Sequence, residues 1–236
     1  MARDTYKEDL AKENDLGINF LDKIYKENDI FGPDFEYQRI TDIEEQHKGI
    51  DLKVVKKETG EVFYIDEKAQ LSYVDIALPT FAFELGSIIN GRNVYGWLFD
   101  DKKVTDKYYL INSIMTDKNQ RYAYCKIYSV SRQKLIGYLN KNNFTKARGQ
   151  KYVDSIRDIC EDDFKKLSTA LKKIDGIVEP TSQTNKSIKI RIKEFDQRDT
   201  KYNINLHVSY ALKEQPINIV IKLSFLVEKG IAKRIF

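Results

Sequence analysis

Residues 50–71 (IDLKVVKKETGEVFYIDEKAQL) contain two runs in which hydrophobic and polar residues alternate, separated by Glu58-Thr59-Gly60-Glu61. A period of two is the spacing of a β-strand, and two such runs joined by a short turn with glycine predict a β-hairpin. A shift of one residue would turn the hydrophobic set of a strand away from the core. This stretch therefore constrains both the secondary structure and the direction in which each side chain points.

The position of the turn determines which residues face each other. A turn centred on Thr59–Gly60 places Asp51 opposite Lys68. A three-residue turn with a bulge would shift the pairing by one and set Asp51 against Glu67. That second register would put the two apolar sets on opposite faces of the hairpin, so we expect the first.

In the expected register, one face of the hairpin is hydrophobic and the other gathers polar side chains. The polar set that we predict to form a catalytic site is Asp51, Asp66, Lys68 and Gln70. An alternative is that Asp66, Glu67 and Lys68 form a solvated strand face with only weak cross-strand ion pairs to Lys53. The spacing inside a patterned hairpin favours the site.

Two carboxylates and an ammonium group suit the hydrolysis of a phosphodiester. Asp51 and Asp66 are predicted ligands of Mg²⁺, a hard cation that prefers carboxylates and keeps several waters, with Mn²⁺ as a substitute. Lys68 can orient the attacking water or stabilise negative charge on the phosphate. Gln70 can position a water or a phosphate oxygen.

Composition excludes several other classes of protein. The 236 residues, 42% of them hydrophobic, suffice for a sizeable core, and no apolar run is long enough to span a membrane. The first residues lack the apolar stretch of a signal peptide, so we expect a cytoplasmic protein without a membrane partner. Cys125, Cys160, His47 and His207 show no zinc-site spacing, and we expect both cysteines to be reduced thiols.

The charge is unevenly distributed along the chain. Residues 1–100 contain 12 Lys and Arg against 21 Asp and Glu, whereas residues 101–236 contain 28 against 15. The segment 118–153 carries nine basic residues and no acidic one. Such a segment suits a polyanion, because basic side chains near phosphates release condensed counterions. The predicted nucleic-acid contacts are Lys134, Lys141, Lys146, Arg148 and Lys151.

The order of predicted elements is a helix near residues 15–27, several strands, a helix over 131–141, a long helix over 152–173, a loop over 180–186 and further strands. This order predicts an α+β or mixed α/β protein built around one central sheet. We expect a core over residues 1–145 and a C-terminal helix with β-strands over 146–236, packed on that core or continuous with it.

The sequence GID at residues 49–51, followed by DEK at 66–68, resembles the signature of the PD-(D/E)xK nuclease superfamily over about residues 15–140. Gly49-Ile50 replaces the usual proline, and Glu67 stands where an apolar residue is usual. The resemblance implies a restriction-endonuclease-like fold, with a central mixed sheet flanked by helices, and metal-dependent cleavage of nucleic acid. It implies Asp51 and Asp66 as metal ligands, Lys68 as the catalytic lysine and Asp22 as a weaker candidate for an accessory acid.

The sequence thus predicts an Mg²⁺-dependent endonuclease that acts on DNA in bacterial defence or in a mobile element, with a symmetric homodimer as one way to cut both strands. Two alternatives stay open: a catalytically inactive nucleic-acid-binding protein of the same fold, and a nuclease of structured RNA. His47 as a base and Glu84 as an added ligand also stay open, although each has a plain structural explanation.

Overall fold

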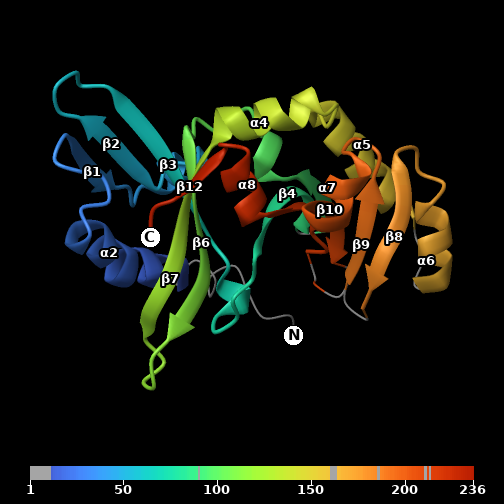
Figure 1. Cartoon of the computed structure of the whole chain (residues 1–236), viewed down its shortest axis with the longest axis horizontal. Coiled ribbons are helices and arrows are strands. Elements are labelled where there is room, and N and C mark those ends of the chain that lie inside the picture. The colour runs from blue at the N-terminus through green and yellow to red at the C-terminus, as the bar shows by residue number, and fades with distance from the viewer. Residues whose placement is uncertain (1–11, 90, 160–163, 185–186, 210–211, 213) are drawn as a thin grey trace. The chain divides into compact units, whose positions relative to one another are not determined.

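The computed structural model describes residues 12–89, 91–159, 164–184, 187–209, 212 and 214–236. The chain forms two compact units (Figure 1). The described residues within 1–79, 103–132 and 230–236 form the first, and those within 80–102 and 133–229 form the second. The sequence analysis placed a boundary at residue 145, whereas the two units interleave along the chain. The protein is mixed α/β, as predicted, but its described residues form two six-stranded sheets instead of the single central sheet that we expected.

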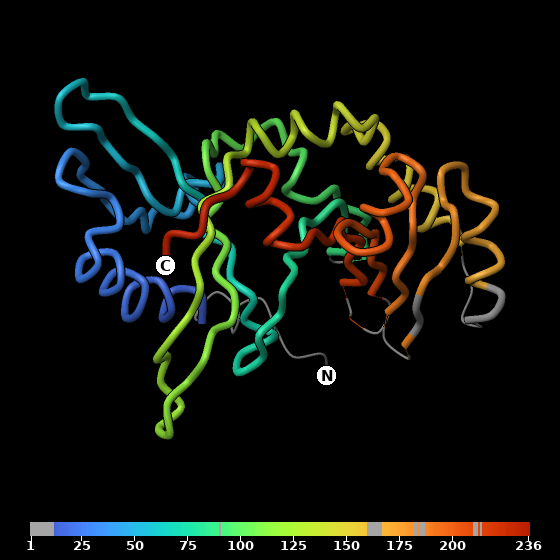
Figure 2. Tube along the Cα trace, in the orientation of Figure 1, coloured from blue at the N-terminus to red at the C-terminus, as the bar shows by residue number. Residues whose placement is uncertain are grey.

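The first unit contains a mixed sheet with the strand order β1-β2-β3-β6-β7-β12. Strands β3 and β6 run parallel, and the other neighbours are antiparallel. The long β6–β7 hairpin is easily followed in the trace of Figure 2. The strands are β1 (Phe35–Arg39), β2 (Leu52–Lys56), β3 (Val62–Ala69), β6 (Lys107–Thr116), β7 (Tyr122–Ser131) and β12 (Ala232–Arg234).

Helical segments pack on this sheet and complete its core. The predicted first helix is present as a π-helical segment η1 (Leu16–Leu21) followed by α2 (Asp22–Glu27). Its apolar side chains pack with those of the central strands in one buried cluster. Two short elements follow β1 and β3, namely α3 (Ile43–His47), which was not predicted, and η2 (Leu71–Tyr73).

The β2–β3 hairpin has the predicted faces but a different register. Leu52 pairs with Ile65 and Val54 with Phe63, two residues away from the expected pairing. The turn lies one residue earlier than predicted, since the backbone N–H of Lys56 donates to Glu61 O at 2.8 Å and residues 57–60 form the loop. A shift of two residues keeps every side chain on its predicted face, because the period of a strand is two.

The second unit contains an antiparallel sheet with the order β5-β4-β11-β10-β9-β8. Residues 180–183 belong to the edge strand β8, where a loop was predicted, and Pro180 lies between two irregularities of the pairing. An edge strand tolerates proline because one side of its backbone makes no ladder bonds. The strands are β4 (Thr80–Ile89), β5 (Arg92–Tyr95), β8 (Ile177–Gln183), β9 (Ser187–Ile192), β10 (Ile204–Ser209) and β11 (Ile217–Lys222).

The prediction of one long helix over residues 152–173 is wrong. Its first part begins earlier, because the hydroxyl of Thr145 caps it by accepting the Arg148 N–H at 3.2 Å, and it ends at Arg157. A separate helix follows at Phe164, and Cys160 lies outside the described residues. The helices are η3 (Trp97–Phe99), α4 (Arg132–Lys141), α5 (Lys146–Arg157), α6 (Phe164–Leu171), α7 (Gln197–Tyr202) and α8 (Leu223–Glu228). In the part of the chain that the structure describes, no helix has the length and apolar character needed to cross a membrane.

Candidate active site

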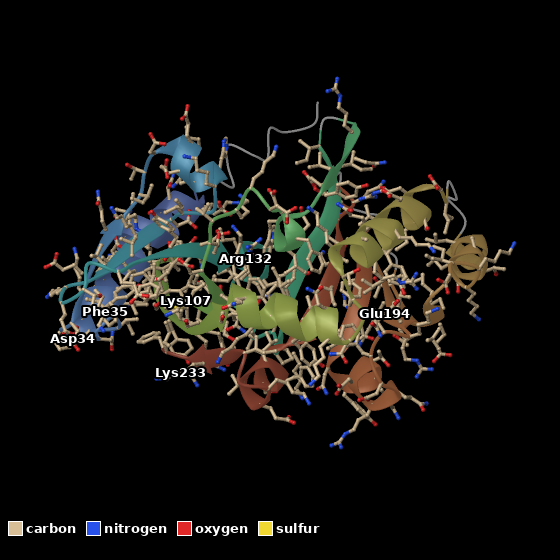
Figure 3. The ribbon with its side chains drawn as sticks, turned by 90° about the horizontal axis from the view of Figure 1, so that it is seen from above. Asp34, Phe35, Lys107, Arg132, Glu194 and Lys233 are labelled. Atoms are coloured by element: carbon tan, nitrogen blue, oxygen red, sulfur yellow. The ribbon has the colours of Figure 1, made fainter. Side chains whose placement is uncertain are left out.

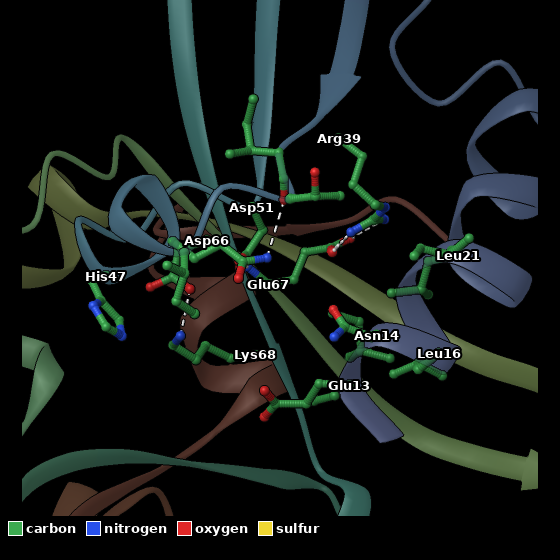
Figure 4. A pocket seen from close by; sticks show the side chains of 17 residues that line it. Glu13, Asn14, Leu16, Leu21, Arg39, His47, Asp51, Asp66, Glu67 and Lys68 are labelled. Atoms are coloured by element: carbon green, nitrogen blue, oxygen red, sulfur yellow. Dashed lines mark hydrogen bonds and ion pairs between the residues drawn. The ribbon is translucent and has the colours of Figure 1, made fainter. Parts of the chain in front are cut away.

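Three of the four residues predicted to form the site line one pocket of the first unit. Asp51 immediately precedes β2, and its backbone N–H donates to Ile65 O at 2.9 Å, so it lies beside the next residue of β3, Asp66. Lys68 lies on the same face of β3 and forms an ion pair with Asp66. The pocket has a volume of about 180 Å³, and Figure 4 shows Asp51, Asp66 and Lys68 around it.

Asp66 has a carboxylate oxygen that is suited to a ligand. The residue is only 2% exposed, and its Oδ2 has no hydrogen-bond partner among the described residues. Gly49 makes room for this oxygen, since a Cβ there would lie 3.3 Å from Asp66 Oδ2 and 2.3 Å from Thr105 Oγ1. Gly49 also has a φ of +79°, which favours glycine. The glycine of the GID sequence is therefore required by its positive φ and by the close approach of Thr105, and it also leaves space beside Asp66.

The neighbouring charges perturb both Asp51 and Lys68. Burial, and next the charge of Asp66, raise the pKa of Asp51 well above its usual range, although its Oδ2 accepts the Glu67 N–H at 2.6 Å. Burial alone would lower the pKa of Lys68, but the carboxylates of Asp66 and Asp51 outweigh it and raise that pKa. Lys68 therefore keeps its proton at neutral pH, and the pair of carboxylates favours a bound cation.

The residues present fit a magnesium ion of the predicted kind. Among the described residues, no group of three or more His, Cys, Asp and Glu side chains is arranged to hold a metal. Mg²⁺ does not need such a group, because it is usually bound by one or two carboxylates and retains several waters. The buried Asp66 oxygen without a hydrogen bond, next to Asp51, supplies these two carboxylates.

Glu67, the unusual middle residue of DEK, points to the opposite face of β3 and belongs to a buried network. Its carboxylate accepts the Tyr25 hydroxyl at 2.5 Å and the Arg39 guanidinium at 2.5 Å. Arg39 also donates to both oxygens of Asp22, at 3.0 and 2.9 Å. Asp22, the weaker candidate for an accessory acid, is thus engaged by Arg39. Glu67 ties the strand that carries Asp66 to the first helix and to β1.

The same network explains a glycine inside the first helix. A Cβ on Gly17 would lie 2.9 Å from the Nη1 atom of Arg39. Glycine in a helix costs about 1 kcal/mol relative to alanine, and here it provides space for the guanidinium. Neither Gly17 nor Arg39 was predicted, because their contact joins segments that are far apart in the chain.

The remaining candidates have mixed outcomes. Gln70 follows the end of β3 and is not among the residues that line the pocket, whereas His47 is. Glu13, which the sequence analysis did not single out, also lines the pocket, and its charge contributes to the raised pKa of Lys68. Extending the helical pattern backwards from residue 15 would have included it. Glu84 belongs to the second unit, where it accepts the Ser87 hydroxyl at 3.3 Å.

The predicted basic contacts all lie on α4 and α5, where they have different surroundings. Lys134 and Lys141 are exposed. Arg148 is held by Glu194 at 2.5 Å and by Asp175 at 3.0 Å, and Figure 3 labels Glu194. The other two form exposed ion pairs, Lys146 with Asp101 and Lys151 with Asp175. A segment without acidic residues in the sequence therefore has acidic neighbours in the folded protein. The ion pairs of Arg148 indicate that it stabilises the fold.

Comparisons with protein-family models, with curated proteins and with solved structures found no match to this chain.

Replacing Asp51 with asparagine should stabilise the metal-free protein at alkaline pH. An unfolded chain ionises this carboxyl near its ordinary pKa of 3.8, whereas the folded protein keeps the proton to higher pH. Folding takes up a proton over that interval, so wild-type stability falls as pH rises through it. Thermal unfolding is measured in EDTA across a pH series. At alkaline pH the unfolding temperature of Asp51→Asn should be higher than that of wild type, and this difference in temperature should shrink as the pH is lowered.

The exposed Asp34 provides the matched control in the same unit. Asp34→Asn should leave the pH dependence of unfolding unchanged. If Asp51→Asn instead destabilised the protein equally at every pH, the carboxylate would be a structural hydrogen-bond acceptor, and the proposed repulsion with Asp66 would be wrong.

Proposed function

We propose that the protein is an Mg²⁺-dependent endonuclease that hydrolyses phosphodiester bonds of DNA. The observation that carries the proposal is the buried oxygen of Asp66, which has no hydrogen-bond partner among the described residues and lies in one pocket with Asp51 and Lys68. A buried carboxylate oxygen without a partner is costly unless a ligand satisfies it.

The residues of the pocket divide the chemistry among them. Bound Mg²⁺ would supply Lewis-acid polarisation of the phosphate and lower the pKa of a coordinated water. Asp51 and Asp66 would hold the ion. Lys68 stays protonated because its pKa is raised, so its part is to orient the attacking water and stabilise negative charge on the phosphate, not to act as a base.

The order of elements in the first unit supports a restriction-endonuclease-like core. Helical residues precede three antiparallel strands, and the third of these, β3, pairs in parallel with β6. Glu13, at the edge of the pocket, replaces Asp22 as the best candidate for the accessory acid, because Arg39 engages Asp22. Lys134 and Lys141 remain proposed contacts to the phosphate backbone.

The test is cleavage of a panel that contains supercoiled plasmid, linear duplex, single-stranded DNA and tRNA, each with Mg²⁺, Mn²⁺ or EDTA. We expect the wild type to cut DNA only with a divalent metal, and Asp66→Asn to lose this activity because the metal loses a charged ligand. Asp34→Asn should retain it.

Each alternative has its own outcome in this panel. Binding without cutting under every metal condition would identify an inactive nucleic-acid-binding protein. Selective cutting of tRNA would show that the substrate is structured RNA and not DNA. If wild type and Asp66→Asn cut equally fast, this pocket is not the catalytic site.

A further inference from the structure

A second polar groove lies wholly within the second unit. It has a volume of about 380 Å³ and is bordered by β8, β9 and α7. None of the basic residues that line it was among the predicted nucleic-acid contacts. Its lining residues are Glu179, Thr181, Lys189, Arg191, Gln197 and Lys201.

The fold fixes these side chains on the outer side of the sheet. Isoleucines at positions 188, 190 and 192 are fully buried, so Lys189 and Arg191 point to the opposite face of β9. On α7, Gln197 and Lys201 are four residues apart and share one face of the helix. Thr200 is 1% exposed and anchors α7, which Asp196 caps by accepting the Asp199 N–H at 2.9 Å.

The groove has an excess of positive charge. Its only acidic lining residue, Glu179, pairs with Arg191 at 2.8 Å. Neither Lys189 nor Lys201 forms an ion pair with any residue in the part of the chain that the structure describes. By contrast, Lys193, which follows β9, is paired with Asp175 at 2.6 Å. Two ammonium groups are therefore available to an anion.

The pKa of a neighbouring histidine, His207, is affected by the positive charge of Lys189. His207 pairs with Lys189 across the β9–β10 ladder. Burial, and next the charge of Lys189, lower the pKa of His207 to about 4. At neutral pH the histidine is uncharged, so the lysines account for the positive charge of this side of the sheet.

We propose that this groove binds the phosphate backbone of the nucleic acid on which the candidate active site acts, an inference that rests on the proposed nuclease function. Flexible lysines on an open groove suit backbone contacts that fix position without reading sequence. Tyr202, next to Lys201, is 60% exposed, and the Lys201 ammonium lies 5.1 Å from the centre of its ring, a contact that leaves the ammonium at the surface. The two ammonium groups come from different elements, β9 and α7, so they suit neighbouring phosphates of one polymer better than a single inorganic anion.

The experiment measures binding of fluorescently labelled duplex DNA in EDTA over a series of salt concentrations. We expect the double variant Lys189→Gln/Lys201→Gln to bind about ten-fold more weakly at moderate salt. The slope of log affinity against log salt should fall by about 1.8, since each lost phosphate contact contributes about 0.9. The charge-retaining Lys189→Arg/Lys201→Arg variant should keep the wild-type slope.

The control removes the same charge elsewhere on the unit. Lys172 and Lys173 are exposed residues that follow α6, and Lys172→Gln/Lys173→Gln should bind within two-fold of wild type. Equal losses in the two double variants would attribute the effect to net charge and overturn the inference. Circular dichroism and thermal unfolding of each variant separate loss of folding from loss of binding.

Cleavage assays on the same proteins keep the two proposals distinguishable. If wild type cuts DNA and the groove variant binds and cuts like wild type, the groove inference fails and the nuclease stands. If binding depends on the groove and no nucleic acid is cut, the nuclease fails and the groove remains a binding site. If wild type neither binds nor cuts, both are overturned.

Discussion

Replacing Lys68 with methionine is expected to slow metal-dependent DNA cleavage by about 10²–10³-fold, the usual cost of removing one group that stabilises transition-state charge. The methionine keeps much of the length of the side chain but cannot neutralise the phosphate. Metal binding should persist, because Asp51 and Asp66 remain and Asp66 loses its competing ion pair with Lys68. Single-turnover cleavage rates, together with calorimetric titration of Mn²⁺, separate these two effects.

Lys53 provides the control for this substitution, since it lies on the paired strand β2 and does not line the pocket. Lys53→Met should cut at the wild-type rate, and Lys68→Arg should recover part of the lost rate by retaining the charge. A Lys68→Met protein that binds Mn²⁺ and cuts as fast as wild type would contradict the proposed role of this ammonium group.

Replacing Arg39 with methionine is expected to lower the free energy of unfolding by about 3–5 kcal/mol, the range found when one partner of a buried ion pair is removed. Arg39 is 14% exposed, and it faces Glu67, 10% exposed, and Asp22, 19% exposed. Without the guanidinium, two largely buried carboxylates would lie near each other with no counter-charge. Urea unfolding measures the loss, and removing Glu67 as well should recover part of it.

An exposed ion pair of the same unit gives the comparison. Lys23 and Glu27 lie 3.8 Å apart with side chains 67% and 62% exposed, so Lys23→Met should cost under about 1 kcal/mol. Equal losses for the two substitutions would mean that Arg39 is not a buried counter-charge. Because the N–H of Glu67 also binds Asp51, Arg39→Met should weaken Mn²⁺ binding in the protein that remains folded.

The sequence predicted the faces of the hairpin but not its register. Hydrophobic alternation determines which side of a strand is buried. A shift of two residues in the pairing leaves each side chain on the same side of its strand. The position of the turn depends on local backbone geometry around Gly60, whose φ is +70°, and alternation alone does not specify it. Asp51, Asp66 and Lys68 therefore came together as predicted, although their exact pairing was wrong.

Long-range contacts account for what the sequence did not reveal. Glu67 was unexplained until Tyr25 and Arg39 were found beside it, since these residues are 42 and 28 positions away. Arg148 looked like a free cation within its acid-free segment, but Glu194, 46 positions later, engages it. Periodicity and local charge report on neighbours in sequence, whereas these networks depend on the tertiary fold.

The interleaving of the two units has a consequence for the order in which the protein can be completed. Strand β12 pairs with β7 in the first sheet, yet residues 133–229 of the second unit precede it in the chain. During synthesis, a ribosome must therefore translate the whole second unit before the first sheet receives its edge strand. No single proteolytic cut divides the protein into its two units, and a nick near residue 229 would leave β12 attached to its sheet only by noncovalent contacts.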